Sequence, residues 1–284
     1  MSVVGFVVHE GREAALAAAD SLRTELASGG STVVDVARAG NEVLDLVVSV
    51  GGDGTFLRGA HVAAQANCPV LGVKVGRLGF LTEVEPGEAL DLIKRALAGD
   101  ASIEERLAAT AEPAGGIEFP AQWGLNEIMV EKGARHRLIR LAVVVDGAYV
   151  TTFSADGVVV ATPTGSTAYS FAARGPIVSP GVPCLVLTPV AAHMVFDRSF
   201  VLGAEQHVVL EVVGDEPGLL SADGRQSVEI PVASRVLIRA ADRPARLVRR
   251  PGAPAFLTRV REKFELPGDP AGGAGFAGDV GAAD

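Results

Sequence analysis

Glycines surround a single acidic residue in the stretch Gly51-Gly52-Asp53-Gly54-Thr55, which follows an apolar run and precedes a segment with helical spacing. Glycines between a strand and a helix let backbone N–H groups approach a phosphate, because no side chain is in the way and the helix start is electropositive. The spacing is neither that of a P-loop nor that of the dinucleotide-binding glycine turn. The stretch therefore indicates a phosphate-binding turn of another kind.

Asp53 needs a separate explanation, because a carboxylate repels phosphate unless it holds a metal ion or acts on the substrate. In phosphoryl transfer a carboxylate can accept the proton of the attacking hydroxyl. The alternative is a plain strand-to-helix turn in which Asp53 is the helix cap. Three glycines around one aspartate favour the acid–base interpretation.

A second stretch, from 162 to 170, is rich in hydroxyl groups: five of the eight residues from 162 to 169 carry one, and glycine and proline fix the backbone between them. Thr164, Ser166 and Tyr169 belong to this run, and the tyrosine ring could pack on a base. The run predicts a nucleotide pocket, although single loop hydroxyls often only stabilise turns. A nucleophilic role for Ser166 is disfavoured, because none of the five histidines lies in a motif typical of a catalytic triad.

The pair Asn126-Glu127 lies just before an apolar strand and is a third candidate. Alone, such a pair is usually a solvated loop end. Together with the first two stretches, however, the pair becomes a candidate for the same binding site.

In residues 1–100, apolar runs of strand length alternate with amphipathic segments. This alternation predicts an α/β layer that would position the glycine turn. A parallel sheet with helices on its faces is expected. The expected strands are 3–8, 44–50 and 69–75, and the expected helices are an alanine-rich one within 11–30 and two more at 55–66 and 86–98.

Residues 101–250 change to short runs of Val, Ile and Thr separated by turns such as Asp146-Gly147, which predicts an antiparallel β domain. The stretch 234–250 is assigned to this domain. An amphipathic pattern at 253–266 predicts a helix that packs back on the first domain. The tail, 267–284, has too little apolar surface to fold and is expected to be disordered.

Composition narrows the function classes. The chain has 284 residues, 48% of them hydrophobic, and a formal charge of −9, which disfavours binding to nucleic acid or to anionic membranes. The two cysteines, Cys68 and Cys184, are expected to be reduced thiols. The sequence shows no signal-peptide pattern and no apolar run of the ~20 residues that span a bilayer, so we expect a cytoplasmic protein.

Taken together and in this order, the motifs resemble those of the NAD kinases. They are VVHEGR, GGDGTFLRGA, LGVKVGRLGFLTEVEP, LNEIMVEKG, DGVVVATPTGSTAYSFAARGPIVSP and SADGRQSVEIP. The GGDGT motif alone is shared with lipid kinases and is related to phosphofructokinases, but the other motifs narrow the resemblance. It implies a Rossmann-like α/β N-terminal domain, a C-terminal antiparallel β-sandwich that binds NAD, and transfer of phosphate from ATP to NAD with Mg²⁺ or another divalent cation.

The resemblance also implies roles for individual residues. Asp53 would activate the 2′-hydroxyl of the adenosine ribose, and Asp156 would reach NAD held by a neighbouring subunit, since the family forms dimers and tetramers. Arg58 and Arg137 lie where the family often contacts NAD. The remaining matches are Gly51, Gly52, Gly54 and Thr55 at phosphate, Asn126 and Glu127 at NAD, and Thr167, Ala168, Tyr169 and Ser170 around the adenosine.

Three departures from the family pattern leave alternatives open. Lys74 replaces a usual Asn, Arg174 replaces a usual Gly, and the segment 188–196 differs. The chain could therefore phosphorylate another nucleoside, a modified dinucleotide or a lipid hydroxyl, or could be a nucleotide sensor without activity, which the intact Asp53 loop disfavours. The donor can be ATP, another triphosphate or polyphosphate, and the acceptor NAD or NADH.

Overall fold

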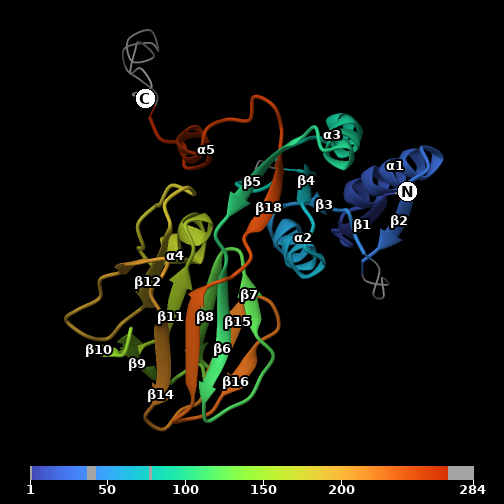
Figure 1. Cartoon of the computed structure of the whole chain (residues 1–284). Coiled ribbons are helices and arrows are strands. Elements are labelled where there is room, and N and C mark those ends of the chain that lie inside the picture. Colours follow the sequence, from blue (N-terminus) through green and yellow to red (C-terminus); the bar gives the residue numbers. More distant parts are fainter. Residues whose placement is uncertain (1, 37–42, 77–78, 268–284) are drawn as a thin grey trace. The chain divides into compact units, whose positions relative to one another are not determined.

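The computed structural model describes residues 2–36, 43–76 and 79–267 (Figure 1). Its internal contacts divide the chain into a large unit up to residue 253 and a separate segment from residue 254 onward. Within the described residues, the large unit contains three sheets of six strands each.

The first sheet is the expected α/β layer. Its strands β2, β1, β3, β4 and β18 run parallel in that order, and β5 is an antiparallel edge strand beside β18. The strands are β1 (Val3–Val8), β2 (Thr32–Asp35), β3 (Leu46–Gly51), β4 (Val70–Lys74), β5 (Ser102–Arg106) and β18 (Ala245–Arg249). The predicted parallel sheet is thus confirmed, and it contains three strands that were not expected in it, β2, β18 and β5.

Helices cover both faces of this sheet because alternate residues of its strands are apolar on each side. Val48 and Val50 of β3 pack with α1 (Glu13–Ser28) and α3 (Pro86–Ala98), whereas Val47 packs with α2 (Asp53–Ala66). The three helices lie close to where their periodicity predicts them. The strand-to-helix turn at residues 51–53 therefore ends a fully buried strand.

Strands β5 and β18 lie in the first sheet, although the sequence pattern assigned residues 101–250 to the second domain. Both are runs of five residues, too short for their pattern to decide between the two domains. Their partner is set by pairing across a large sequence distance, with Leu247 opposite Glu104, and local patterning does not encode this pairing.

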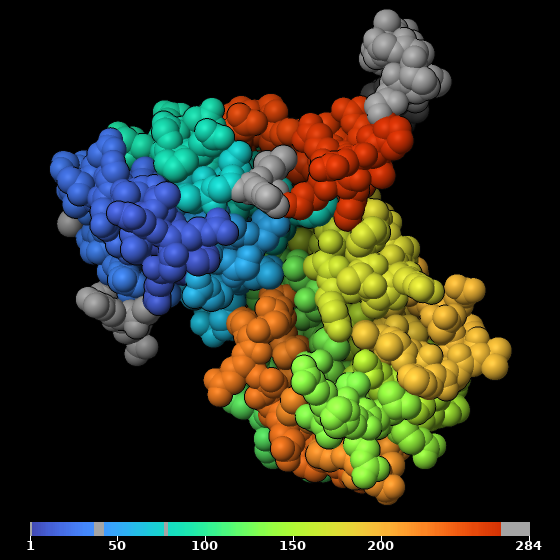
Figure 2. Space-filling model, turned by 180° about the vertical axis from the view of Figure 1, so that it is seen from behind, coloured from blue at the N-terminus to red at the C-terminus, as the bar shows by residue number. Residues whose placement is uncertain are grey.

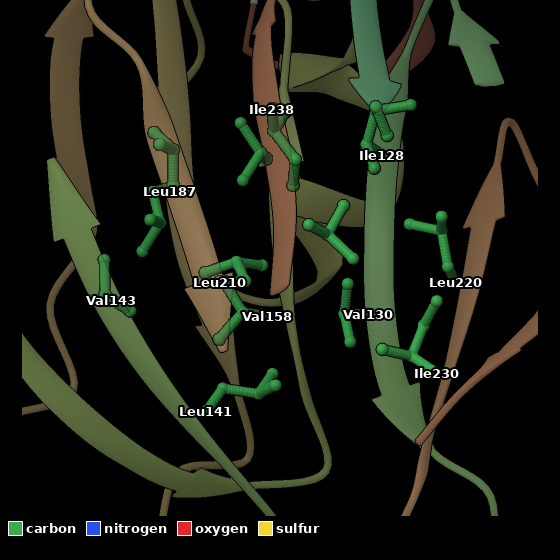
Figure 3. Packing of buried hydrophobic residues seen from close by; sticks show 14 of the residues in the cluster. Ile128, Val130, Leu141, Val143, Val158, Leu187, Leu210, Leu220, Ile230 and Ile238 are labelled. Atoms are coloured by element: carbon green, nitrogen blue, oxygen red, sulfur yellow. The ribbon is translucent and has the colours of Figure 1, made fainter. Parts of the chain in front are cut away.

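The other two sheets form the expected antiparallel sandwich, with orders β10-β9-β14-β17-β6-β7 and β13-β12-β11-β8-β15-β16. Figure 3 shows side chains of both sheets, such as Val143, Leu210 and Val130, meeting in one buried core. The strands are β6 (Ala109–Gly115), β7 (Gln122–Gly124), β8 (Glu127–Lys132), β9 (Ile139–Val145), β10 (Ala148–Ala155), β11 (Gly157–Ala161), β12 (Cys184–Val190), β13 (Phe200–Gly203), β14 (Val208–Val213), β15 (Gly218–Ala222), β16 (Val228–Ile230) and β17 (Arg235–Ala240).

The segment from residue 254 contains α5 (Phe256–Lys263), so a helix forms within the range where the pattern predicted one. Its packing on the first domain stays a prediction. The tail expected to be disordered lies, apart from Pro267, outside the described residues. Among the described helices, none is long and apolar enough to cross a membrane.

Candidate active site

The glycine turn joins the end of β3 to the start of α2. Gly52 is the N-cap residue and makes no side-chain cap, and Asp53 is the first residue of the helix. Asp53 is therefore not the cap that the alternative interpretation required. Gly51 packs so closely that a Cβ there would lie 2.6 Å from the Thr55 hydroxyl oxygen, and Thr55 itself is buried. Gly54 is exposed at the first turn of the helix.

The carboxylate of Asp53 is held by the segment that follows β4. Its Oδ2 accepts a hydrogen bond from the backbone N–H of Phe80 at 2.8 Å, and its Oδ1 accepts one from Leu81 at 3.1 Å. Gly79 allows this approach, because a Cβ at that position would lie 2.0 Å from Asp53 Oδ1. The side chain is only partly buried, so a fixed carboxylate stands at the start of a helix with access to solvent.

A shared hydrophobic cluster connects this turn to the sandwich. Phe56 of α2 and Leu81 belong to the same buried cluster as Leu125, the residue before Asn126. Phe56, in the first turn of the helix that begins at Asp53, and Leu125, next to Asn126, thus hold the first and third candidate stretches close together.

Asn126 and Glu127 lie directly against the hydroxyl-rich stretch, because β8 pairs with β11 and places Glu127 opposite Ala161. The Asn126 carbonyl accepts a hydrogen bond from the N–H of Thr162 at 2.8 Å. A Cβ at Gly165 would lie 2.0 Å from that carbonyl oxygen, so only glycine fits there. The second and third candidate stretches are therefore in direct contact.

Asp223 fixes the backbone of this pair from a distant turn. Its carboxylate accepts hydrogen bonds from the N–H groups of Leu125, Asn126 and Glu127 at 2.8, 2.8 and 3.2 Å. Burial, and then the negative charge of Asp223, raise the pKa of Glu127 to about 8. Glu127 is therefore mostly protonated at neutral pH and can donate a hydrogen bond, which an ionised carboxylate cannot.

The hydroxyl-rich stretch forms the short 3-10 helix η1 (Thr164–Thr167) and the helix α4 (Tyr169–Ala172). Ser166 is fully buried: its hydroxyl lies 2.7 Å from the Pro163 carbonyl and accepts from the N–H of Val178 at 2.9 Å. Ser170 is also buried, 3.3 Å from the Thr188 hydroxyl. These two hydroxyls shape the loop and are engaged within the protein.

Thr167, Ala168 and Tyr169 are the members of the stretch that reach solvent, and Tyr169 is 41% exposed. Their segment, coloured yellow, lies on the surface shown in Figure 2. Burial, followed by the negative charges of Glu131, Asp156 and Glu127, raises the pKa of Tyr169. The tyrosine therefore remains a neutral ring beside three acidic groups.

Asp156 and Arg137 lie at the other end of β8 from Asn126. The carbonyl of Asp156 accepts from the N–H of Lys132, the last residue of β8, and its carboxylate pairs with the Lys132 ammonium at 2.5 Å. Arg137 follows in the next loop, where its guanidinium lies 3.4 Å from Glu216. Within one chain the structure does not bring these two residues to Asp53.

The structure also places three basic residues that the sequence analysis singled out. Arg58 is exposed on α2. Lys74 lies opposite Gly51 in the sheet and pairs with Glu85 at 3.1 Å. Arg174 has a backbone φ of 69°, a left-handed conformation that glycine adopts without strain. This conformation explains why the family that the motifs resemble usually has glycine at this position.

Residues 6–101 match the family model described as the ATP-NAD kinase N-terminal domain, and residues 125–250 match the one for the ATP-NAD kinase C-terminal domain. The chain belongs to the NAD kinase family. The resemblance inferred from the sequence motifs is therefore confirmed, and so are the predicted class of enzyme, a kinase, and the fold.

Relatives within the family match over most of the chain. An NAD kinase of Leifsonia xyli subsp. xyli is 39% identical over 286 residues, covering 92% of this chain and 93% of the relative. An NAD kinase of Heliobacterium modesticaldum is 42% identical over 224 residues, covering 78% of this chain and 79% of the relative.

Two solved structures have the same fold. A yeast NADH kinase complexed with NADH superimposes with a TM-score of 0.82 at 22% identity, covering 95% of this chain and 89% of that chain. An NAD kinase from Archaeoglobus fulgidus in complex with ATP superimposes with a TM-score of 0.74 at 25% identity, covering 94% of this chain and 99% of that one.

Several residues of the site were not identified from the sequence. Gly79 and the N–H groups of Phe80 and Leu81 hold Asp53, and Asp223 holds the Asn126-Glu127 pair. The sequence offered a signal for each, because LGF and Asp223-Gly224 both lie within motifs that carry the family resemblance. Neither signal says which side chain the segment contacts.

Proposed function

We propose that this chain is an NAD kinase that transfers the terminal phosphoryl group of ATP to the 2′-hydroxyl of the adenosine ribose of NAD, giving NADP and ADP. The observation that carries the proposal is the placement of Asp53. Its carboxylate is fixed at the start of α2, beside a glycine turn, and the cluster containing Leu125 joins this turn to the Asn126-Glu127 pair.

Asp53 would act as the general base. It takes the proton from the 2′-hydroxyl as the ribose oxygen attacks the γ-phosphorus, and the bond from that phosphorus to the bridging oxygen breaks to release ADP. The N–H groups of the turn at 51–55 and the start of α2 would face the phosphates. Asn126 and protonated Glu127 would offer hydrogen bonds to the dinucleotide, and Thr167, Ala168 and Tyr169 would form the exposed wall around the adenosine.

A divalent cation such as Mg²⁺ fits this site as a partner of ATP. Among the described residues, no group of three or more His, Cys, Asp or Glu side chains is suited to hold a metal. Mg²⁺ is commonly bound by substrate phosphates, water and one or two carboxylates, and Asp53 could supply one carboxylate. When bound, the ion neutralises charge on the transferring phosphoryl group.

The assembly and location of the protein are part of the same proposal. Asp156 lies at the far end of β8 from Asn126. It would contact NAD that is bound by a neighbouring subunit of a homodimer or homotetramer. A cytoplasmic location is supported by the two buried free thiols of Cys68 and Cys184, as expected in a reducing compartment.

The test is to incubate the purified protein with ATP, Mg²⁺ and NAD and to measure NADP with an NADP-specific dehydrogenase. Parallel reactions replace NAD by NADH, or ATP by another triphosphate or polyphosphate. We expect NADP to form from NAD, and a folded protein that forms none would overturn the proposal.

Asp53→Asn tests the role of the base. We expect kcat to fall by roughly 10²-fold or more, while NAD binding measured by calorimetry is retained. Asp91→Asn, which changes an exposed carboxylate on α3, is the control and should leave kcat unchanged. Equal turnover in the Asp53→Asn variant and the wild type would remove Asp53 from the mechanism.

A further inference from the structure

A chain of ion pairs runs from the segment that holds Asp53 to the hydroxyl-rich loop. It begins at Glu83, two residues after Leu81, whose side chain is only 3% exposed and lies 2.5 Å from Arg249. Arg249 also pairs with Glu104 at 3.1 Å, and Glu104 pairs with Arg106 at 2.6 Å. We call these four residues the ion-pair chain.

The ion-pair chain ends on the nucleotide loop. Arg106 Nη1 donates a hydrogen bond to the Thr164 hydroxyl at 3.3 Å, while its Nε faces Glu104. Thr164 is the first residue of η1, and both Arg106 and Thr164 are buried. A buried arginine at the end of an edge strand requires such partners, because an unpaired buried charge is strongly unfavourable.

Arg106 also occupies a special place in the connectivity. It is the last residue of β5 in the first sheet, and only Leu107 and Ala108 separate it from β6 in the sandwich. The Arg106 side chain therefore lies where the chain passes from the first sheet to the sandwich, and it contacts the loop that begins at Thr164. One planar guanidinium binds both Glu104 and Thr164. It therefore connects the loop 164–170 to the first sheet, in which β3 leads into Asp53.

We propose that Arg106 is a positioning residue for phosphoryl transfer, which sets the place of the loop 164–170 relative to Asp53 through the Thr164 hydroxyl. This inference rests on the proposed function, because it assigns the loop to NAD and Asp53 to the reacting hydroxyl. Misplacing a bound substrate by about 1 Å costs roughly 100-fold in rate. Loss of the tie lowers kcat more than it weakens NAD binding.

The experiment compares Arg106→Lys, Thr164→Val and Thr164→Ser with the wild-type protein. Lysine keeps a positive charge beside Glu104, but its single ammonium cannot match the guanidinium fork that spans both partners. We expect Arg106→Lys and Thr164→Val each to lower kcat by roughly 10-fold to 100-fold, with the NAD dissociation constant within about 3-fold of wild type. Thr164→Ser, which retains the hydroxyl, restores kcat.

Arg239→Lys is the matched control, because Arg239 of β17 also pairs with two acids, Glu112 at 2.8 Å and Asp242 at 2.6 Å. It lowers thermal stability and leaves kcat and KM unchanged. Wild-type kcat in both Arg106→Lys and Thr164→Val would overturn the inference, as would loss of NAD binding at unchanged kcat. If the wild-type protein makes no NADP, the proposed function itself fails, and this result is distinct from the other two.

Discussion

Gly79 lies against the carboxylate of Asp53 so closely that a methyl group at position 79 would come within 2.0 Å of Oδ1. The neighbouring N–H groups of Phe80 and Leu81 hold both carboxylate oxygens. The orientation of the proposed base therefore depends on a residue that has no side chain.

Gly79→Ala is expected to displace the Asp53 carboxylate and to lower kcat by roughly 10-fold to 100-fold, because a small misplacement of a reacting group is costly. Steady-state kinetics and the thermal midpoint are measured together. Gly87→Ala is the control, since a Cβ at Gly87 meets nothing within 4 Å. Wild-type kcat in Gly79→Ala would mean that the carboxylate position is not critical.

Asp223→Ala is expected to destabilise the protein by about 2–4 kcal/mol, because it leaves three backbone N–H groups of 125–127 without their acceptor. NAD affinity should fall as well, since Asn126 and Glu127 lose their fixed backbone. Denaturant unfolding and calorimetry measure the two effects.

The control for Asp223 is Asp146→Ala. Asp146 also accepts a backbone hydrogen bond, from His207 at 2.9 Å, but it lies in an exposed hairpin turn. A smaller loss of stability and unchanged NAD affinity are expected. Equal effects of the two substitutions would count against a special role of Asp223.

Glu127 is expected to make stability fall with rising pH. Its pKa rises from 4.5 to about 8 on folding, so between these values the folded protein holds a proton that the unfolded chain has released. The contribution is fully present below the unfolded pKa and is lost as the pH rises to about 8. From about pH 5 to about pH 8, wild type should lose about 2–4 kcal/mol more than Glu127→Gln.

Urea unfolding of both proteins across this pH range checks the prediction. Asp223, whose pKa burial also raises, and Arg225, which lies near it, are present in both proteins, so the difference between them reports on Glu127. Parallel pH profiles for wild type and Glu127→Gln would show that Glu127 ionises normally.

Arg174→Gly is expected to raise the free energy of unfolding by about 1 kcal/mol, because Arg174 has a left-handed backbone that L side chains adopt at a cost. Arg174→Ala keeps a side chain in that conformation and should give no such gain. The preference for NAD over other acceptors should be unchanged in both variants. A changed acceptor preference would instead make Arg174 a determinant of the substrate.

Much of the site could be predicted from local sequence. The glycine turn after β3, the Asn126-Glu127 pair and the hydroxyl-rich stretch from 162 to 170 could each be recognised from short motifs, turn chemistry and strand periodicity. The contacts that fix these parts are long-range: Arg106 meets Thr164 across 58 residues, and Asp223 meets Asn126 across 97. Such contacts follow from the packing of three sheets, which no local pattern specifies.

The place of β5 and β18 in the first sheet could not be predicted for the same reason. Each has only five residues, so its propensity suits either domain, and its pairing joins two segments that lie on either side of the sandwich in the sequence.

The sandwich lies between β5 and β18 in the sequence, and this order matters for how the chain folds as it leaves the ribosome. When the first hundred residues emerge, β4 lacks the neighbour that will cover its open edge until residues 245–249 arrive. An isolated N-terminal fragment would thus expose an unpaired parallel strand, the kind of edge that recruits other chains into aggregates. The two halves of this chain should therefore be produced together.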